Sequence, residues 1–357
     1  MALLASNCGG RAISPSDGSS VDVCGSRGIC SSPPPSCAPG GPGMSDCGAG
    51  RESCCISLEV TGGTFYRSYG PNPNGGTSSD ADPATVSGFR LDKYDVTVGR
   101  FRRFVAAWAA GWRPLPGSGK HAHLNGAQGL IDISGAADAG ATYETGWLAA
   151  DNGNVAATDA SLICQVAEFA SWTPSVGMRE NRPINCVNWF EAQAFCIWDG
   201  GFLPSEAEYE YAAAGGSQQR VYPWGSTESG GAIQYAICGD DQGNCYYPSG
   251  TLERCSGMSI APVGTATSGA GRFGQLDLSG NMWQWVADWF FHYTECTDCA
   301  ALTAPPPDFR LTAVSSRGLR GGSFSSSTPD LRAPARVAWS DPGDRSLNEG
   351  FRCARIP

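Results

Sequence analysis

Cysteine is the residue type with the greatest chemical potential in this sequence. The 357 residues include 16 cysteines but only three histidines. So many thiols with so few histidines favour disulfides in an oxidising compartment over zinc sites. Cys296 and Cys299 have the spacing of a redox motif, but such a motif normally opens a helix after a strand. Here the pair lies between an aromatic stretch and a triple proline, so we expect a structural disulfide.

Histidine offers one candidate for metal chemistry, the pair His121 and His123. If the segment is a strand, alternate side chains share one face, and both imidazoles could point the same way. A metal site needs further ligands, and no third one is evident in the sequence. We expect histidines that lie at the surface or form hydrogen bonds, and the sequence leaves a metal role open.

The composition excludes some partners and indicates a fold type. The net charge is −10, which argues against a nucleic-acid partner because phosphate binding needs a basic surface. No run of 18 apolar residues is present, so no transmembrane helix is expected. The 48 glycines and 24 prolines predict a loop-rich domain rather than a helical bundle.

Residues 1–57 form a block of their own, rich in cysteine, glycine and proline and almost without aliphatic periodicity. Such a composition predicts a tether or a small disulfide-stapled segment. Small residues directly precede Cys8, as at the end of a lipoprotein signal, although a charged n-region is missing. We expect a lipid anchor at Cys8 to be the only membrane attachment, and the main domain to span residues 58–357.

Three helices of the main domain are predicted from their N-caps, Thr97, Asn188 and Ser205. Apolar residues recur at helical spacing after the first cap. Glutamate stands three residues after each of the other two caps, which is the pattern of a capping box. The third helix also carries several acidic residues that should complement its positive end and face solvent. These residues are Glu206, Glu208 and Glu210.

Strands are predicted at residues 58–65 and 87–96, whereas residues 110–180 read as long loops. The aromatic cluster Trp283, Trp285 and Trp289 alternates with other residues. It is expected to pack in the core, with a ligand platform as the alternative.

Nine short motifs occur in an order that resembles the sulfatase-modifying factor family, also called the formylglycine-generating enzyme family. They are Gly62–Phe65, Asp92–Thr97, Pro183–Trp189, Leu203–Tyr211, Tyr222–Gly225, Ala261–Gly264, Leu276–Trp285, Arg320–Phe324 and Gly350–Arg355. The resemblance covers residues 58 to 357. It implies an α+β, C-type-lectin-like fold that is loop-rich and low in regular secondary structure.

The resemblance also implies a calcium site in the segment from Asp277 to Gln284. Asp277 and Gln284 would supply side-chain oxygens, and Gly280 and Met282 would supply backbone carbonyls, which are ligands that calcium prefers. The family usually has glutamate in place of Gln284, so one ligand charge is lost here. The alternative is a tight turn closed by hydrogen bonds without an ion. A second family site near residues 235–260 cannot be transferred, because that region carries cysteines instead.

A disulfide between Cys196 and Cys353 is a further implication of the resemblance. It would tie the C-terminus to the second predicted helix. The partners of another family bridge are missing, since Ala213 and Ala335 stand at about those places. Other pairs, such as Cys164 with Cys186, would have to compensate.

The family's catalytic chemistry depends on two cysteines that bind copper, because soft thiolates suit Cu(I). The matching positions here are Ser326 and Leu331, so the chain lacks the catalytic cysteine pair. Formylglycine-generating activity is therefore not expected, nor is copper or iron as a cofactor. Whether the chain is an enzyme at all stays open.

Two functions are compatible with the loss of the catalytic cysteine pair. In binding proteins of the superfamily, the segment between the Gly-Gly-Ser-aromatic and Gly-Phe-Arg motifs forms a ligand-binding face. Here that face would comprise Ser325, Ser326, Asp330, Arg332, Arg336 and Trp339. We expect an exported, calcium-stabilised module for a protein or small-molecule ligand, in the periplasm or on the cell surface. The alternative is a metal-dependent oxidoreductase, as in the related sulfoxide synthases of ergothioneine biosynthesis.

Overall fold

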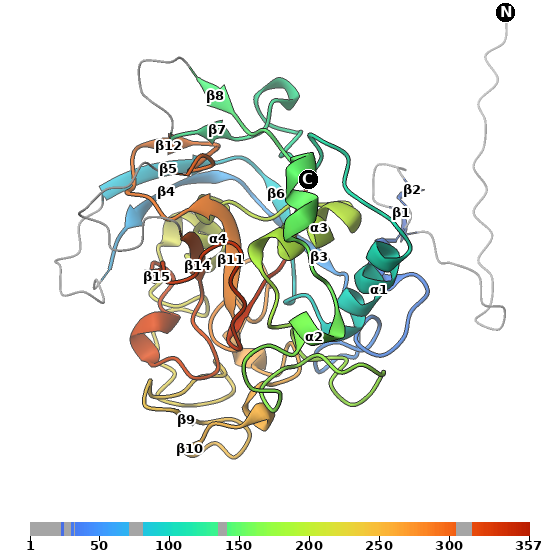
Figure 1. The fold of residues 1–357 in the computed structure, drawn as a ribbon. Helices are drawn as coiled ribbons and strands as arrows, with labels where there is room; N and C mark the ends of the chain where they lie inside the picture. Colours follow the sequence, from blue (N-terminus) through green and yellow to red (C-terminus); the bar gives the residue numbers. More distant parts are fainter. Residues whose placement is uncertain (1–22, 25–29, 32, 71–80, 135–140, 305–315) are drawn as a thin grey trace, which may run out of the picture. The chain divides into compact units, whose positions relative to one another are not determined.

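The computed structural model describes residues 23–24, 30–31, 33–70, 81–134, 141–304 and 316–357 (Figure 1). The chain divides into two compact units, Met1–Pro33 and Pro34–Pro357. In the first unit, β1 (Val23–Cys24) pairs antiparallel with β2 (Cys30–Ser31). Cys8, the expected lipid-anchor position, lies outside the described residues.

The second unit begins at Pro34, earlier than the composition of the sequence indicates. The Ser36 amide donates to Oδ1 of Asp199 at 3.0 Å, and Nε of Arg100 donates to the Ser36 hydroxyl at 3.0 Å. Two disulfides close the loops of this segment, Cys37–Cys55 and Cys47–Cys54. Polar contacts and disulfides, rather than aliphatic periodicity, thus attach residues 34–56 to the domain.

The three helices predicted from their N-caps are confirmed. α1 (Val98–Ala109) follows Thr97, whose hydroxyl accepts the N–H of Arg100 at 3.2 Å. Complete capping boxes open α3 (Trp189–Trp198) and α4 (Glu206–Ala213). Each cap satisfies helix N–H groups that would otherwise lack a partner.

The strands are short and form several small sheets, so the expectation of an α+β, loop-rich domain is confirmed. The strand predicted over residues 87–96 is shorter than expected, because only Phe89–Asp92 is extended and paired, and the stretch 110–180 is mostly loop.

The strands of the second unit are β3 (Ser57–Val60), β4 (Gly63–Ser68), β5 (Ala81–Val86), β6 (Phe89–Asp92), β7 (Ile131–Asp132), β8 (Thr142–Tyr143), β9 (Asn244–Cys245), β10 (Glu253–Arg254), β11 (Trp283–Trp289), β12 (Cys296–Thr297), β13 (Cys299–Ala300), β14 (Arg317–Arg320), β15 (Arg336–Val337), β16 (Glu349–Gly350) and β17 (Ala354–Arg355). The remaining helical pieces are η1 (Pro35–Cys37), η2 (Asn125–Ala127), η3 (Ala149–Asn154), α2 (Asp159–Leu162), η4 (Gly216–Gln218), η5 (Gly257–Ser259), η6 (Thr267–Gly269) and η7 (Thr328–Leu331).

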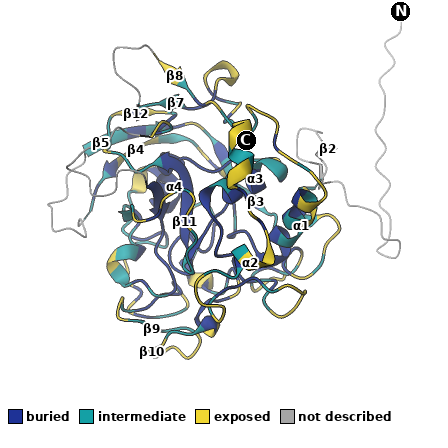
Figure 2. Ribbon diagram, viewed as in Figure 1, coloured by how far each residue is buried: buried dark blue, intermediate teal, exposed yellow. Residues whose placement is uncertain are grey.

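The sheet that positions the candidate site has the strand order β15-β14-β11-β16. β11 runs antiparallel to β14 and parallel to β16, with Trp283 opposite Glu349. Trp283 and Trp285 are both fully buried, as expected for core residues. β11 lies among buried segments in the middle of the domain (Figure 2). Residues that follow β14 or precede β16 are therefore held next to a rigid central strand.

The glutamates of α4 do not face solvent, which corrects the sequence-based expectation. Glu206, Glu208 and Glu210 are at most 3% exposed. Arg320 of β14 pairs with Glu206 at 2.9 Å and with Glu210 at 2.6 Å, and His121 contacts Glu208 at 3.0 Å. The acidic residues tolerate burial because distant basic side chains pair with them.

The disulfide expected between Cys196 and Cys353 is present, with a Cα–Cα distance of 5.4 Å. Further bridges are Cys164–Cys186, Cys245–Cys255 and Cys296–Cys299. The Cys-x-x-Cys pair is therefore a disulfide, as expected. Within the described part of the chain, Cys238 is a free, buried cysteine.

Removing the Cys196–Cys353 bridge should destabilise the domain more than removing Cys245–Cys255. The sequence separations are 157 and 10, respectively. In the chain-entropy model, loops of these lengths correspond to about 5 and about 3 kcal/mol. Chemical unfolding of the two double Cys→Ala variants measures the difference. An unchanged midpoint for Cys196→Ala/Cys353→Ala would contradict the stabilising role of this bridge.

Candidate functional site

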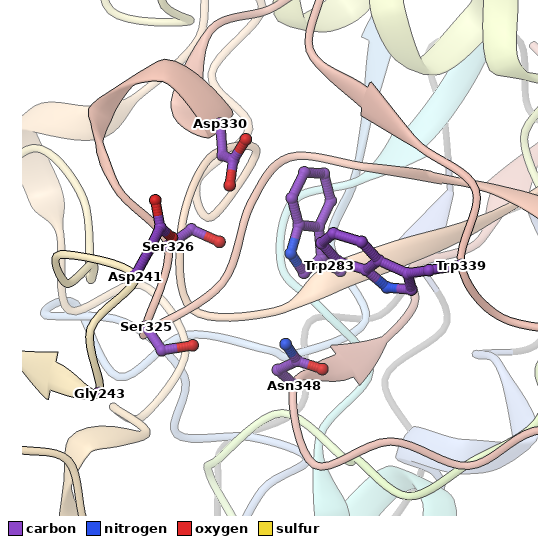
Figure 3. Close-up of a pocket in the computed structure, with 8 residues that line it drawn as sticks. All are labelled: Asp241, Gly243, Trp283, Ser325, Ser326, Asp330, Trp339 and Asn348. Atoms are coloured by element: carbon purple, nitrogen blue, oxygen red, sulfur yellow. The ribbon is translucent and has the colours of Figure 1, made fainter.

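A pocket of about 460 Å³ opens where the segment after β14 meets the start of β11 and two loops (Figure 3). Its lining combines carboxylates, indoles, hydroxyls and an amide. The lining residues are Asp241, Gly243, Trp283, Ser325, Ser326, Asp330, Trp339 and Asn348. This volume lies in the range of sites for small molecules or single side chains.

Two glycines after β14 direct the chain into the pocket wall. Gly321 and Gly322 have φ values of 99° and 74°, in the region that favours glycine. A Cβ on Gly321 would lie 2.6 Å from the hydroxyl of Tyr209, so a side chain does not fit there. The following turn is closed by the amide of Ser323, which donates to the Ser326 hydroxyl at 3.1 Å. The backbone therefore presents Ser325 and Ser326 at the pocket.

A loop before β9 lies against this wall through backbone hydrogen bonds. The amides of Gly239 and Asp241 donate to the carbonyls of Ser326 and Ser325 at 2.8 and 3.1 Å. The Ser327 amide donates to Oδ1 of Asp241 at 2.9 Å. These bonds bring Asp241 into the site, where the sequence-based prediction had not placed it. A polar stretch before Gly243 marks a loop, but nothing in the sequence indicates the segment it packs against.

Two tryptophans form the opposite side of the pocket. Their rings meet edge to face, with centroids 5.5 Å apart and an interplanar angle of 85°. Trp283 is fully buried, whereas Trp339 is 55% exposed. The Trp283 amide donates to the carbonyl of Asn348 at 2.8 Å, which places the asparagine side chain at the pocket. Trp283 thus belongs to the core, as expected, and also lines the pocket.

Four of the six residues expected on the ligand-binding face line the pocket: Ser325, Ser326, Asp330 and Trp339. Arg332 and Arg336 are not among the lining residues. Nη2 of Arg336 donates to Glu206 at 2.8 Å, so this arginine pairs with α4 instead of facing the pocket.

The two positions that match the family's thiols have different surroundings. The Ser326 side chain is buried, and its hydroxyl accepts the Ser323 amide at 3.1 Å. Leu331 is fully buried in an apolar cluster with Tyr222 and Cys238 and does not line the pocket. A hydroxyl and a packed leucine side chain provide no soft ligand for Cu(I).

Asp330 in the pocket lining and Glu349 on the neighbouring strand β16 have raised pKa values. Burial, followed by repulsion from Asp241, raises the pKa of Asp330 to about 6, against the hydrogen bond from Ser326. Burial raises the pKa of Glu349 to about 7, against hydrogen bonds from Ser340 and Trp339. Near neutral pH, Asp330 is mostly ionised, whereas Glu349 is only partly ionised.

The segment expected to bind calcium is held by hydrogen bonds. The Gly264 amide donates to Oδ2 of Asp277 at 2.7 Å. The Gln284 amide nitrogen donates to the Asp277 carbonyl at 2.7 Å, and Oε1 of Gln284 accepts from Nε of Arg352 at 2.6 Å. The Gly280 carbonyl accepts the amide of Met282 at 2.9 Å. Burial raises the pKa of Asp277 to about 6, against the opposing effects of Arg352 and the Gly264 amide.

His121 and His123 lie in a loop and a turn rather than in a strand. His121 is fully buried and lies 3.0 Å from a carboxylate oxygen of Glu144 and of Glu208. Burial lowers its pKa, but the two carboxylates outweigh burial and raise it to about 10. The protonated imidazole has no free lone pair for a metal ion. It forms a buried ion pair with each glutamate.

Within the described ranges, no three or more His, Cys, Asp or Glu side chains gather so that they could hold a metal ion. None of the described helices has the length and apolarity needed to cross a membrane.

Comparison with known proteins gives consistent matches. Residues 49–357 match the family model of the sulfatase-modifying factor enzyme 1-like domain. The formylglycine-generating enzyme of Thermomonospora curvata is 28% identical over 324 residues, which cover 84% of this chain and 93% of that enzyme. The inactive C-alpha-formylglycine-generating enzyme 2 of Bos taurus is 32% identical over 188 residues. That match covers 51% of this chain and 53% of the bovine protein, about half of each.

Among solved structures, PvdO from Pseudomonas aeruginosa is similar, with a TM-score of 0.51 and 19% identity. The alignment covers 84% of this chain and 94% of PvdO, and it supports the fold alone. Together with the family model, it confirms the expected α+β, C-type-lectin-like fold. The chain belongs to the sulfatase-modifying factor family and is a divergent member in which Ser326 and Leu331 replace the catalytic cysteine pair.

Proposed function

We propose that the domain is a ligand-binding module that does not generate formylglycine. The observation that carries this proposal is the wall of the pocket. A hydroxyl, Ser326, stands at one thiol position, while the other position, Leu331, is packed into the core. Copper chemistry needs two soft ligands that can meet at one ion, and this wall supplies neither. The pocket itself retains the volume and the polar groups of a binding site.

A relative supports the loss of activity. The bovine protein similar to half of this chain is called an inactive formylglycine-generating enzyme. Its name shows that the family includes members without the activity. The Thermomonospora enzyme, which matches over nearly its whole length, provides the active comparison.

We propose that the protein works in an oxidising compartment, in the periplasm or on the cell surface, with a lipid anchor at Cys8. The disulfides of the second unit support export, because such bridges are rare in reducing compartments. Radiolabelled palmitate incorporation, lost on Cys8→Ala, would test the anchor.

The chain should not convert a sulfatase-type cysteine to formylglycine. Copper-loaded protein is incubated with a cysteine substrate peptide, and the peptide is analysed by mass spectrometry, with the Thermomonospora enzyme as positive control. An unchanged peptide mass is expected, because Ser326 and Leu331 cannot act as thiolates. Appearance of the aldehyde mass would overturn the proposal. Stoichiometric copper or iron retained by the purified protein would favour the alternative, a metal-dependent oxidoreductase.

Calcium remains a proposed cofactor. Asp277 fits it, since this buried carboxylate has a raised pKa that a bound dication would lower. The other predicted ligands fit less well. Oε1 of Gln284 already accepts from Arg352, and this guanidinium also donates to the Asp277 carbonyl. A positive charge in this place competes with an ion, so we expect binding weaker than in family members with glutamate there.

Thermal unfolding tests the calcium site. Millimolar calcium should raise the unfolding midpoint of the wild type, because a ligand that binds only the folded state stabilises it. Asp277→Asn should abolish the shift, and magnesium should produce a smaller one. An identical midpoint for the wild type in calcium and in chelator would count against the site.

A further inference from the structure

The pocket carries negative charge without a basic residue in its lining. Asp241 and Asp330 both face it, and none of the lining residues is lysine or arginine. Both aspartates contact Ser327: Oδ1 of Asp241 accepts its amide at 2.9 Å, and the Asp330 amide donates to its carbonyl at 3.1 Å. Repulsion from Asp241 contributes to the raised pKa of Asp330. Arg254 is exposed on β10, about 3.5 Å from where a Cβ on Gly243 would lie, and it does not line the pocket. A cationic group between the aspartates would relieve their repulsion.

An aromatic face lies opposite these carboxylates. Trp339 is 55% exposed, and its ring packs edge to face on Trp283 with the centroids 5.5 Å apart. The hydroxyl of the next residue, Ser340, donates to Glu349. An ordered, exposed indole next to paired carboxylates is the arrangement that favours ammonium and guanidinium groups through cation–π attraction.

The remaining polar groups of the pocket include unused hydrogen-bond donors. The indole N–H of Trp283 is buried and has no partner among the described residues. Figure 3 shows this nitrogen on the side of the ring that faces the serines. The amide nitrogen of Asn348 also points into the pocket in that view. A buried donor without a partner is costly, so the site is suited to a ligand that brings an acceptor oxygen.

We propose that the pocket binds an organic cation, an alkylammonium or alkylguanidinium group with a carbonyl or hydroxyl oxygen nearby. Asp330 and Asp241 hold the cation, Trp339 packs on it, and Trp283 and Asn348 donate to the oxygen. This inference rests on the proposed binding function and names the ligand chemistry. The group can belong to a basic side chain of a peptide or to a free small amine, since the same contacts serve both.

Titration calorimetry on the full chain, in low salt at pH 7.5, tests the inference with two probes of the same shape. Nα-acetylarginine methylamide carries the guanidinium, and Nα-acetylcitrulline methylamide carries a neutral urea in its place. The arginine probe should bind at least about tenfold more tightly, because only it can pair with the aspartates. Ethanolamine, as a free amine with a hydroxyl, distinguishes a small-molecule ligand from a peptide side chain by which of the two cations binds better.

Single substitutions test which side chains bind the cation. Asp330→Asn should remove most of the preference for arginine over citrulline. Asp341→Asn, which removes an equal charge from an exposed position outside the lining, should leave it unchanged. Trp339→Leu should weaken the binding of the arginine probe while the unfolding midpoint stays the same. At pH 5 the arginine probe should bind less tightly than at pH 7.5, because Asp330 gains a proton below its pKa of about 6.

The outcomes separate the two proposals. If citrulline, glucose or acetate binds in this pocket as tightly as the arginine probe, the cation inference is wrong and the binding function stands. If Asp330→Asn keeps the full preference for arginine, the assignment of the cation to this aspartate is overturned. If the arginine probe, ethanolamine, the citrulline probe, glucose and acetate all fail to bind, and none of them changes tryptophan fluorescence, both proposals fail.

Discussion

Buried guanidinium groups organise this domain, and Arg352 shows how. The side chain is fully buried, and its planar fork donates to Asp95 at 2.9 Å, to Gln284 at 2.6 Å and to the carbonyls of Leu276 and Asp277. Only arginine offers five donors in a rigid plane that can satisfy several loops at once. Removing one member of such a buried set typically costs about 3–5 kcal/mol, because the remaining charge stays buried without a partner. The turn before β11, and with it the position of Trp283, depends on this group.

The same principle connects α4 to the wall of the pocket. Arg320 ends β14 and pairs with Glu206 and Glu210, while the next residues are the two glycines that direct the chain to Ser325 and Ser326. The acidic residues of α4 thus have two functions: they complement the positive end of the helix and they hold an arginine of the central sheet. In a domain with few long strands, such ion pairs hold a helix and a strand in a fixed relative position, as the hydrogen bonds of an extended sheet would do elsewhere.

The sequence predicted those features that depend on neighbouring residues. The caps at Thr97, Asn188 and Ser205 set the helix starts because they act within one turn. The buried state of Glu208 could not be predicted in this way, since its partner His121 lies 87 positions away. Asp241 was missed for the same reason: its place at the pocket depends on bonds to Ser325 and Ser327. Family motifs supplied the long-range knowledge that local patterns lack, as in the Cys196–Cys353 bridge.

The exchange of thiols for other side chains leaves the scaffold intact for a physical reason. The pocket wall is held mainly by backbone groups, such as the Gly239 and Asp241 amides that bond the carbonyls of Ser326 and Ser325. These bonds do not depend on which side chain occupies position 326. A serine there keeps the turn, and a leucine at position 331 adds to the apolar cluster around Tyr222. Because most of the bonds that hold this wall come from the backbone, the pocket persists with serine and leucine at these positions.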